Sequence, residues 1–120
     1  MQRWNLREIE TPNGSRSPVV LDTGDVGRAV LIGLEPGQRL GEHEVKEHAF
    51  VLVVDGSALF EVGGEAVAAP PGTLFHFEPE ERHAVSTDAG ARLLLFLAPW
   101  PGAGHYRGDR PAAAAAEPDA

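Results

Sequence analysis

Short apolar segments of β-forming residues recur along this chain, and turn-forming residues separate each segment from the next. Pro36-Gly37 fits the central positions of a type II turn, while Asp55-Gly56 and Gly63-Gly64 are typical of tight hairpins. No window of helical length shows a 3.6-residue apolar period. The sequence therefore predicts about eight strands, at residues 19–21, 28–35, 50–54, 57–62, 65–69, 73–77, 83–87 and 91–98.

Strands at this regular spacing predict an all-β protein, an antiparallel barrel or jelly roll. The central segments, such as FVLVV and LLLFL, are apolar on both faces. This pattern indicates two sheets folded over each other, with a further layer or a partner outside. We expect a short N-terminal arm over residues 1–18, the barrel over 19–98 and a tail over 99–120. The tail is rich in proline and alanine, and we expect it to be flexible and mostly disordered after about residue 108.

The charge balance limits the partners of the chain. It has 18 acidic and 10 basic residues, a formal net charge of −8, and no cysteine. A nucleic-acid partner would require a basic patch, so we expect none, and thiolate zinc sites are excluded. The first residues lack the apolar core of a secretory signal, and the longest apolar run, LLLFLAPW, is too short to cross a bilayer. We therefore expect a cytoplasmic protein that does not contact membranes.

Four histidines lie at or beside strands that would be neighbours in a small barrel, namely His43, His48, His76 and His83. Imidazole is the commonest protein ligand of first-row metals. Two or three of these side chains in one cavity, with a carboxylate, would suit Zn, Ni, Mn or Fe. The alternative is that each histidine ends a strand or is half-buried with a hydrogen bond, without binding a metal.

Two stretches resemble the motifs of the cupin superfamily, in particular of small single-domain cupins. PGQRLGEHEVKEHAFVLVVDG (36–56) is similar to the first motif, and APPGTLFHFEPEERHAV (69–85) is similar to the second. The likeness spans about residues 28–98. It implies a double-stranded β-helix barrel, often dimeric, in which three histidines and a glutamate can bind one metal ion at the barrel mouth. Cupin activities range from dioxygenases, decarboxylases and isomerases to simple binding proteins.

Only some of the cupin metal ligands have a matching residue in this chain. His43 matches the first histidine of the first motif, and His83 matches the histidine of the second. Val45 stands where the first motif has its second histidine, and Ala49 stands where it has glutamate. The resemblance therefore implies two of the four ligands, with apolar residues in place of the other two.

Other residues beside these positions could complete a metal site. In a regular strand His48 would point out while Ala49 points in, but a turn or bulge would change this alternation. In a regular strand Glu47 would point into the barrel like Ala49, but it lies at a turn. If Glu78 points inward, His76 faces the cavity too. We predict His43, His83 and His48 as metal ligands, and His76, Val45, Ala49 and Glu47 as residues that line the cavity.

Three functions remain open from the sequence. The first is a metal-dependent small-molecule enzyme that uses a divalent Zn, Ni, Mn or Fe ion in the His-lined barrel. The second is a metal-free barrel that binds or senses a small molecule without catalysis, which Val45 and Ala49 favour. The third is a purely structural partner protein, which a closed barrel lined only by apolar side chains would support. We also predict a homodimer, because Phe75 and Phe77 would lie opposite His76, on an outward face that a second subunit could cover.

Overall fold

The computed structural model describes residues 1–12 and 18–105. Within this part of the chain no helix is long and apolar enough to span a membrane. The described residues form nine strands: β1 (Val19–Thr23), β2 (Arg28–Leu34), β3 (Arg39–His43), β4 (His48–Gly56), β5 (Ala58–Val62), β6 (Glu65–Ala69), β7 (Leu74–Phe77), β8 (His83–Ser86) and β9 (Ala91–Ala98).

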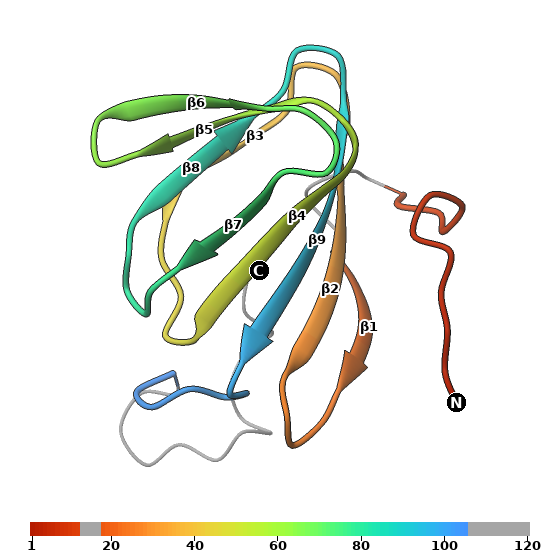
Figure 1. The fold of residues 1–120 in the computed structure, drawn as a ribbon, viewed down its shortest axis with the longest axis vertical. Coiled ribbons are helices and arrows are strands. Elements are labelled where there is room, and N and C mark those ends of the chain that lie inside the picture. Colours follow the sequence, from red (N-terminus) through yellow and green to blue (C-terminus); the bar gives the residue numbers. More distant parts are fainter. Residues whose placement is uncertain (13–17, 106–120) are drawn as a thin grey trace.

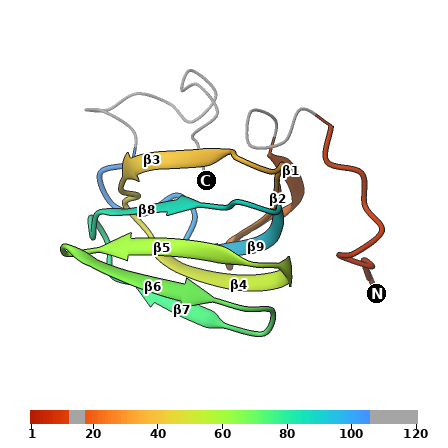
Figure 2. The same cartoon turned by 90° about the horizontal axis from the view of Figure 1, so that it is seen from above.

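The strands form two antiparallel sheets that face each other as the walls of a flattened barrel (Figures 1 and 2). The larger sheet has the order β1-β2-β9-β4-β7, and the smaller has the order β3-β8-β5-β6. In β9, every second residue from Ala91 to Leu97 is buried, and the residues between them are only half-buried. Because successive side chains point to opposite faces of a strand, one face of each strand packs into a core between the sheets. The prediction of an all-β jelly roll is confirmed.

Three predicted turns have different outcomes. Gly37 has a φ of +82°, and the Gln38 N–H donates to the Glu35 carbonyl at 2.9 Å, which confirms the turn at Pro36-Gly37. Gly63-Gly64 joins β5 to its antiparallel partner β6, as predicted for a hairpin. The hairpin predicted at Asp55-Gly56 is wrong, because β4 and β5 belong to different sheets.

Gly56 instead carries the chain from one sheet to the other. Its φ is +73°, and a Cβ atom there would lie 2.1 Å from the Gly90 carbonyl oxygen. Only glycine allows this backbone conformation and this close approach together. The turn at Gly90 makes the return crossing from β8 to β9, so the two crossings lie against each other at one end of the barrel.

The sequence did not predict β3 as a strand. Its residues, RLGEH, are mostly polar and exposed, so they lack the apolar alternation of a half-buried strand. Pairing with β8 nevertheless fixes the segment at the edge of the smaller sheet. This edge strand ends at His43, the first of the predicted site residues.

Segments before β1 and after β9 pack onto the barrel. Arg92 donates hydrogen bonds to the carbonyl oxygens of Leu6 and Ile9, at 2.9 and 2.5 Å, and so holds the N-terminal arm against β9. After β9, Trp100 packs against the hydrophobic core. The predicted disorder after about residue 108 lies outside the described residues.

Candidate functional site

His43 and His83 are brought together by strand pairing. β3 ends at His43, β8 begins at His83, and these two residues are direct partners in the ladder. An irregularity in the pairing between Leu40 and His43 sets this register. The two imidazole centroids lie 4.4 Å apart with the ring planes at 60°. Two residues that are distant in the sequence therefore form one imidazole pair at the end of the smaller sheet.

Backbone carbonyls fix the protonation pattern of both rings. Nδ1 of His43 lies 2.8 Å from the Gly41 carbonyl oxygen, and Nδ1 of His83 lies 3.1 Å from the Glu81 carbonyl oxygen. A carbonyl oxygen only accepts, so each Nδ1 carries the hydrogen and donates it. In the neutral form each Nε2 then keeps a free lone pair. The pair therefore offers two nitrogen atoms to a ligand or a metal ion.

His83 is the more buried member of the pair. Its residue is 5% exposed, and its ring stacks on Phe77 with the centroids 3.9 Å apart and the planes at 4°. Burial lowers the pKa of His83 below the ordinary value of 6.5, and the nearby His43 lowers it further. The bond to the Glu81 carbonyl opposes this shift without cancelling it. His83 is therefore neutral at physiological pH.

The lowered pKa of His83 predicts a loss of stability in mild acid. The unfolded chain binds the proton more readily than the folded chain, so the free energy of unfolding falls as the pH drops below about 6.5. The fall ends once the pH passes below the lowered pKa of the folded state. Urea unfolding across this range should show a shallower decline for His83→Gln than for the wild type. Equal slopes for the two proteins would contradict this assignment.

Val45 and Ala49 are buried members of the hydrophobic core. They occupy the two positions at which the resemblance to cupins implies a histidine and a glutamate. Their side chains have no donor atom for a metal. These two positions therefore supply apolar packing and no metal ligand.

The sequence suggested that Glu47 lines a cavity with the imidazole pair. The structure instead places its side chain against the segment that follows β9. Its side chain is fully buried, and Oε2 accepts a hydrogen bond from the Gly102 N–H at 2.8 Å. The same oxygen lies 2.6 Å from Nδ1 of His105. A Cβ atom at position 102 would lie 2.6 Å from the Lys46 carbonyl oxygen, so glycine permits this close approach. Glu47 therefore fastens the segment that follows β9.

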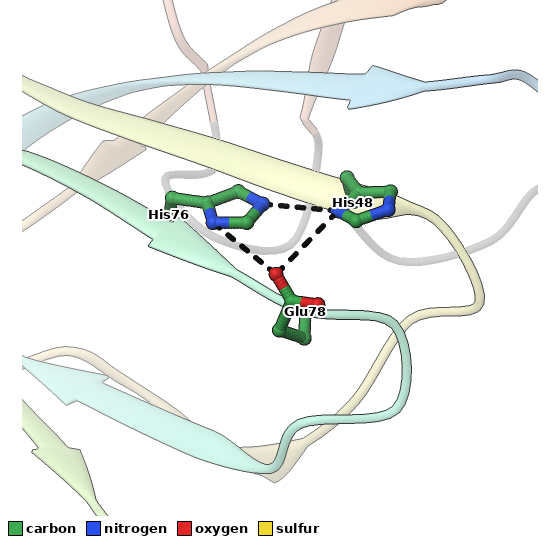
Figure 3. A group of neighbouring side chains, drawn as sticks. All are labelled: His48, His76 and Glu78. Carbon is green, nitrogen blue, oxygen red and sulfur yellow. Dashed lines mark hydrogen bonds and ion pairs between the residues drawn. The ribbon is translucent and has the colours of Figure 1, made fainter.

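His48 and His76 lie beside each other on the outer face of the larger sheet (Figure 3). The group of ligand-type side chains to which they belong includes neither His43 nor His83. In β7, Phe77 belongs to the core and Phe75 packs against it, so the alternate residue His76 points outward and is exposed. In β4, the buried Ala49 places the preceding His48 outside in the same way. The expected inward position of His76 and outward position of the two phenylalanines are therefore reversed.

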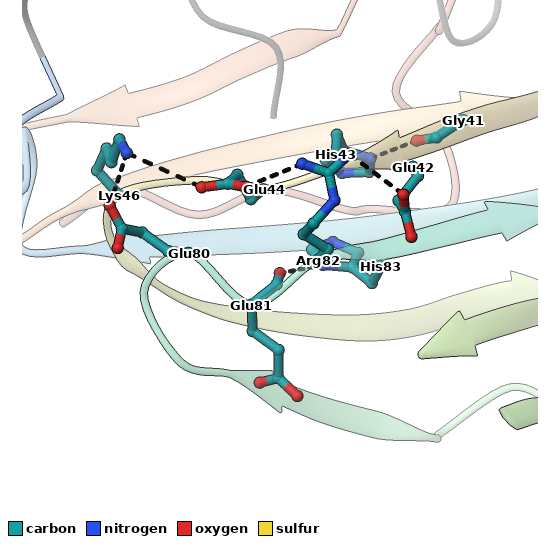
Figure 4. A network of polar contacts seen from close by, with 9 residues as sticks. All are labelled: Gly41, Glu42, His43, Glu44, Lys46, Glu80, Glu81, Arg82 and His83. Carbon is teal, nitrogen blue, oxygen red and sulfur yellow. Dashed lines mark hydrogen bonds and ion pairs between the residues drawn. The ribbon is translucent and has the colours of Figure 1, made fainter. Parts of the chain in front are cut away.

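The carboxylates that flank the imidazole pair are held by cations (Figure 4). Arg82 contacts Glu42 at 3.2 Å and Glu44 at 3.0 Å, while Lys46 contacts Glu80 at 2.7 Å. The bond to Glu42 raises the pKa of Arg82, and the bond between Lys46 and Glu80 raises the pKa of Lys46 and lowers that of Glu80. Exposed pairs of this kind add little stability. They do keep these carboxylates paired on the rim.

Two surface cavities lie away from the histidines. One, of about 370 Å³, is lined by Thr11 of the N-terminal arm and by residues of the β2, β4 and β9 ends, including Gly56 and Arg92. The other, of about 320 Å³, lies beside the start of β5 and the ends of β6 and β8. Neither cavity is lined by a histidine. The side chains with ligand-type nitrogens therefore lie outside both cavities.

The paired sheets place this chain in the class of double-stranded β-helix barrels, and comparisons with solved structures agree. An RmlC-like cupin from Desulfovibrio desulfuricans shares 20% identity over 82% of this chain and 97% of its own, with a TM-score of 0.73. A Klebsiella pneumoniae protein with a double-stranded β-helix domain shares 17% identity over 85% of this chain and 93% of its own, with a TM-score of 0.73. The Clostridium difficile EutQ protein shares 16% identity over 71% of this chain and 68% of its own, with a TM-score of 0.63. At these identities the likeness shows the fold alone.

The family follows from the sequence match. Residues 30–97 match the family model described as the cupin domain, and the chain belongs to this family. No curated protein gives a significant match to the chain. The resemblance found in the two motifs is therefore confirmed at the level of family and fold.

Proposed function

We propose that this cupin binds a small polar molecule through the Nε2 atoms of His43 and His83. The observation that carries the proposal is the fixed orientation of the pair. Each Nδ1–H is bonded to a backbone carbonyl, and the rings lie 4.4 Å apart. A ligand with O–H or N–H groups would donate to the two lone pairs at once.

The surroundings of the pair support a neutral site. Burial keeps His83 uncharged, and neutral imidazole accepts a hydrogen bond or a proton. Val45 and Ala49 present apolar side chains where other cupins have ligands. These features favour a polar organic ligand over a metal centre with four protein ligands. A simple binding or sensing role is the first candidate function.

A metal-dependent enzyme is the second candidate, and one observation favours it. Histidines that bind metal commonly donate their other ring N–H to a carbonyl or carboxylate, as both members of this pair do. Two such nitrogens would hold a Zn, Ni, Mn or Fe ion only with further ligands from water or substrate. A bound ion would supply Lewis-acid chemistry at this point.

Substitution of the pair tests the proposal. His43→Ala and His83→Ala should each abolish thermal stabilisation by the organic compounds that stabilise the wild type, because a ligand of the native state raises the melting temperature. A panel of small polar acids, alcohols and amines would be screened without metal, and Zn, Ni, Mn and Fe(II) would be screened separately. Stabilisation by organic compounds that both variants lose would support the first candidate, and stabilisation by a metal that both variants lose would support the second. Loss of binding in only one of the two variants would contradict a shared site.

A homodimer and a cytoplasmic location stay predictions. Because Phe75 and Phe77 face the core, the apolar residues exposed on the outer face of β4 and β7 are Phe50 and Leu74. Contact between two copies through this face would cover both side chains. Sedimentation should then give twice the chain mass of 12.8 kDa, and the mass of a monomer would contradict the dimer. Fractionation of cells that express the protein would test the location.

A further inference from the structure

A second group of ligand-type side chains lies on the outer face of the larger sheet. β4 and β7 are antiparallel, with Phe50 opposite His76 and Ala49 opposite Phe77. Continuing this register by one step places Glu78 opposite His48. His48, His76 and Glu78 therefore share one face, because residues two apart in a strand point to the same side. β7 is the edge strand of its sheet.

The ligand atoms of these three side chains converge (Figure 3). Nδ1 of His48 lies 3.0 Å from Nε2 of His76 and 3.8 Å from Oε2 of Glu78, and Nδ1 of His76 lies 3.5 Å from the same oxygen. Bonds of about 2.0–2.2 Å to a tetrahedral Zn²⁺ separate neighbouring ligand atoms by about 3.3 Å. His76 can offer only one of its two nitrogens to an ion, and one ligand atom from each residue then lies within 4.8 Å of the other two. The side chains would therefore move closer together to hold a tetrahedral ion.

The surroundings favour a metal ion held at this point. The imidazoles of His48 and His76 are stacked at 10°, and Phe50 lies 4.8 Å from His76 and supports its ring. The three side chains are 37–67% exposed, so an ion can enter and keep water in its remaining positions. Two nitrogens and one carboxylate suit Zn²⁺, Ni²⁺ or Fe²⁺ better than Mg²⁺ or Ca²⁺, which prefer oxygen ligands.

We propose that His48, His76 and Glu78 form a divalent transition-metal site on the outside of the barrel. Among the described residues this is the one group of three or more such side chains whose ligand atoms lie within 4.8 Å of one another. It shares no residue with the His43–His83 pair. A metal bound here is therefore independent of the small-molecule site proposed above.

Calorimetric titration of the tag-free full chain with Zn²⁺ tests the site. One ion per chain is expected to bind to the wild type. Loss of a residue that only supports a metal ligand already costs about 10- to 100-fold in affinity, so His48→Ala and His76→Ala should each weaken binding at least that much. Glu78→Gln should also weaken it, because the neutral amide replaces a charged ligand. All three side chains are exposed, so these variants should keep the wild-type fold and circular dichroism spectrum.

The double variant His43→Ala/His83→Ala serves as the matched control, since it also removes two histidines. It should bind Zn²⁺ at the outer face with wild-type affinity. Absorption of Co²⁺ in place of Zn²⁺ should report a low-symmetry site in the wild type and in this control, and none in His48→Ala. No binding to the wild type, or binding lost in the control and kept in His48→Ala, would overturn the proposal. Either result leaves the test of the small-molecule site unaffected.

Discussion

Replacing His105 by alanine is expected to lower the free energy of unfolding by about 1–3 kcal/mol, because a buried acceptor loses its hydrogen-bond partner. The His105 ring lies 2.6 Å from Glu47, whose side chain is fully buried. Within the described residues the other oxygen of Glu47 has no hydrogen-bond partner, so Oε2 carries its contacts with both His105 and the Gly102 N–H. Without the imidazole, the buried side chain of Glu47 loses one of the two partners of Oε2. The total free energy of unfolding of a typical domain is only about 5–15 kcal/mol, so this loss should be easy to measure.

Urea unfolding of His105→Ala and of the double variant His105→Ala/Glu47→Gln measures this effect. If the cost comes from an uncompensated charge, the added Glu47→Gln change should restore part of the lost stability. Its neutral amide oxygen can still accept from the Gly102 N–H. A loss below about 1 kcal/mol for His105→Ala would contradict the importance of the buried pair.

Replacing Phe60 by alanine is expected to cost about 3–5 kcal/mol, through lost burial and the cavity left behind. Phe60 is 1% exposed and is the largest of the fully buried side chains. Its ring lies 4.2 Å from Phe75 and 6.3 Å from Phe77, so it joins the smaller sheet to β7 of the larger one. Removing the ring opens a cavity at the contact between the two sheets.

Phe50→Ala provides the matched control, because it deletes the same atoms from an outward position. Phe50 is 40% exposed on the outer face of β4, so its loss should cost less than half as much. Thermal and urea unfolding of both variants would compare the two sites. Equal losses would show that the core does not lie where the alternation of β4 and β5 places it.

The fold was predictable because local signals agree with the final structure in most strands. Residues 93–98, for example, carry an unbroken apolar run with no turn signal, and they lie in a central strand, β9. β3 escaped prediction because RLGEH has no apolar alternation, and only its pairing with β8 makes it a strand. Asp55-Gly56 has the sequence of a hairpin, but the chain passes there from one sheet to the other. Such a choice depends on the partners of β4 and β5 and not on the turn residues.

The sites depend more heavily on contacts that are distant in the sequence. The meeting of His43 and His83 follows from the two motifs, since the resemblance to cupins implies that these residues share one barrel mouth. Glu78 was not predicted as a ligand, because its position beside His48 follows from the register of β4 with β7. In a regular strand Ala49 would point into the barrel and His48 would point out. The turn beside these residues left open which of the two side chains points inward. No local signal connects Glu47 to His105, since only the folding back of the C-terminal segment joins them.

The pair at the barrel end and the group on the outer face differ in their chemistry. His43 and His83 have their Nδ1 hydrogens donated to backbone carbonyls, which leaves the Nε2 lone pairs free. His48 and His76 contact each other, so one ring donates its N–H to a lone pair of the other. The outer group also has the carboxylate of Glu78 as a third ligand, whereas the imidazole pair has no third ligand from Val45 or Ala49. We therefore expect Zn²⁺ to bind to the outer group and organic ligands to bind to the imidazole pair.

The most direct test of the imidazole pair is nitrogen NMR of histidine-labelled protein at slightly alkaline pH, where neutral rings show which nitrogen carries the hydrogen. For both His43 and His83, Nδ1 should have the chemical shift of a protonated nitrogen and Nε2 that of a nitrogen with a free lone pair. A hydrogen on Nε2 of either ring would contradict the account, because that Nδ1 could then not donate to its carbonyl.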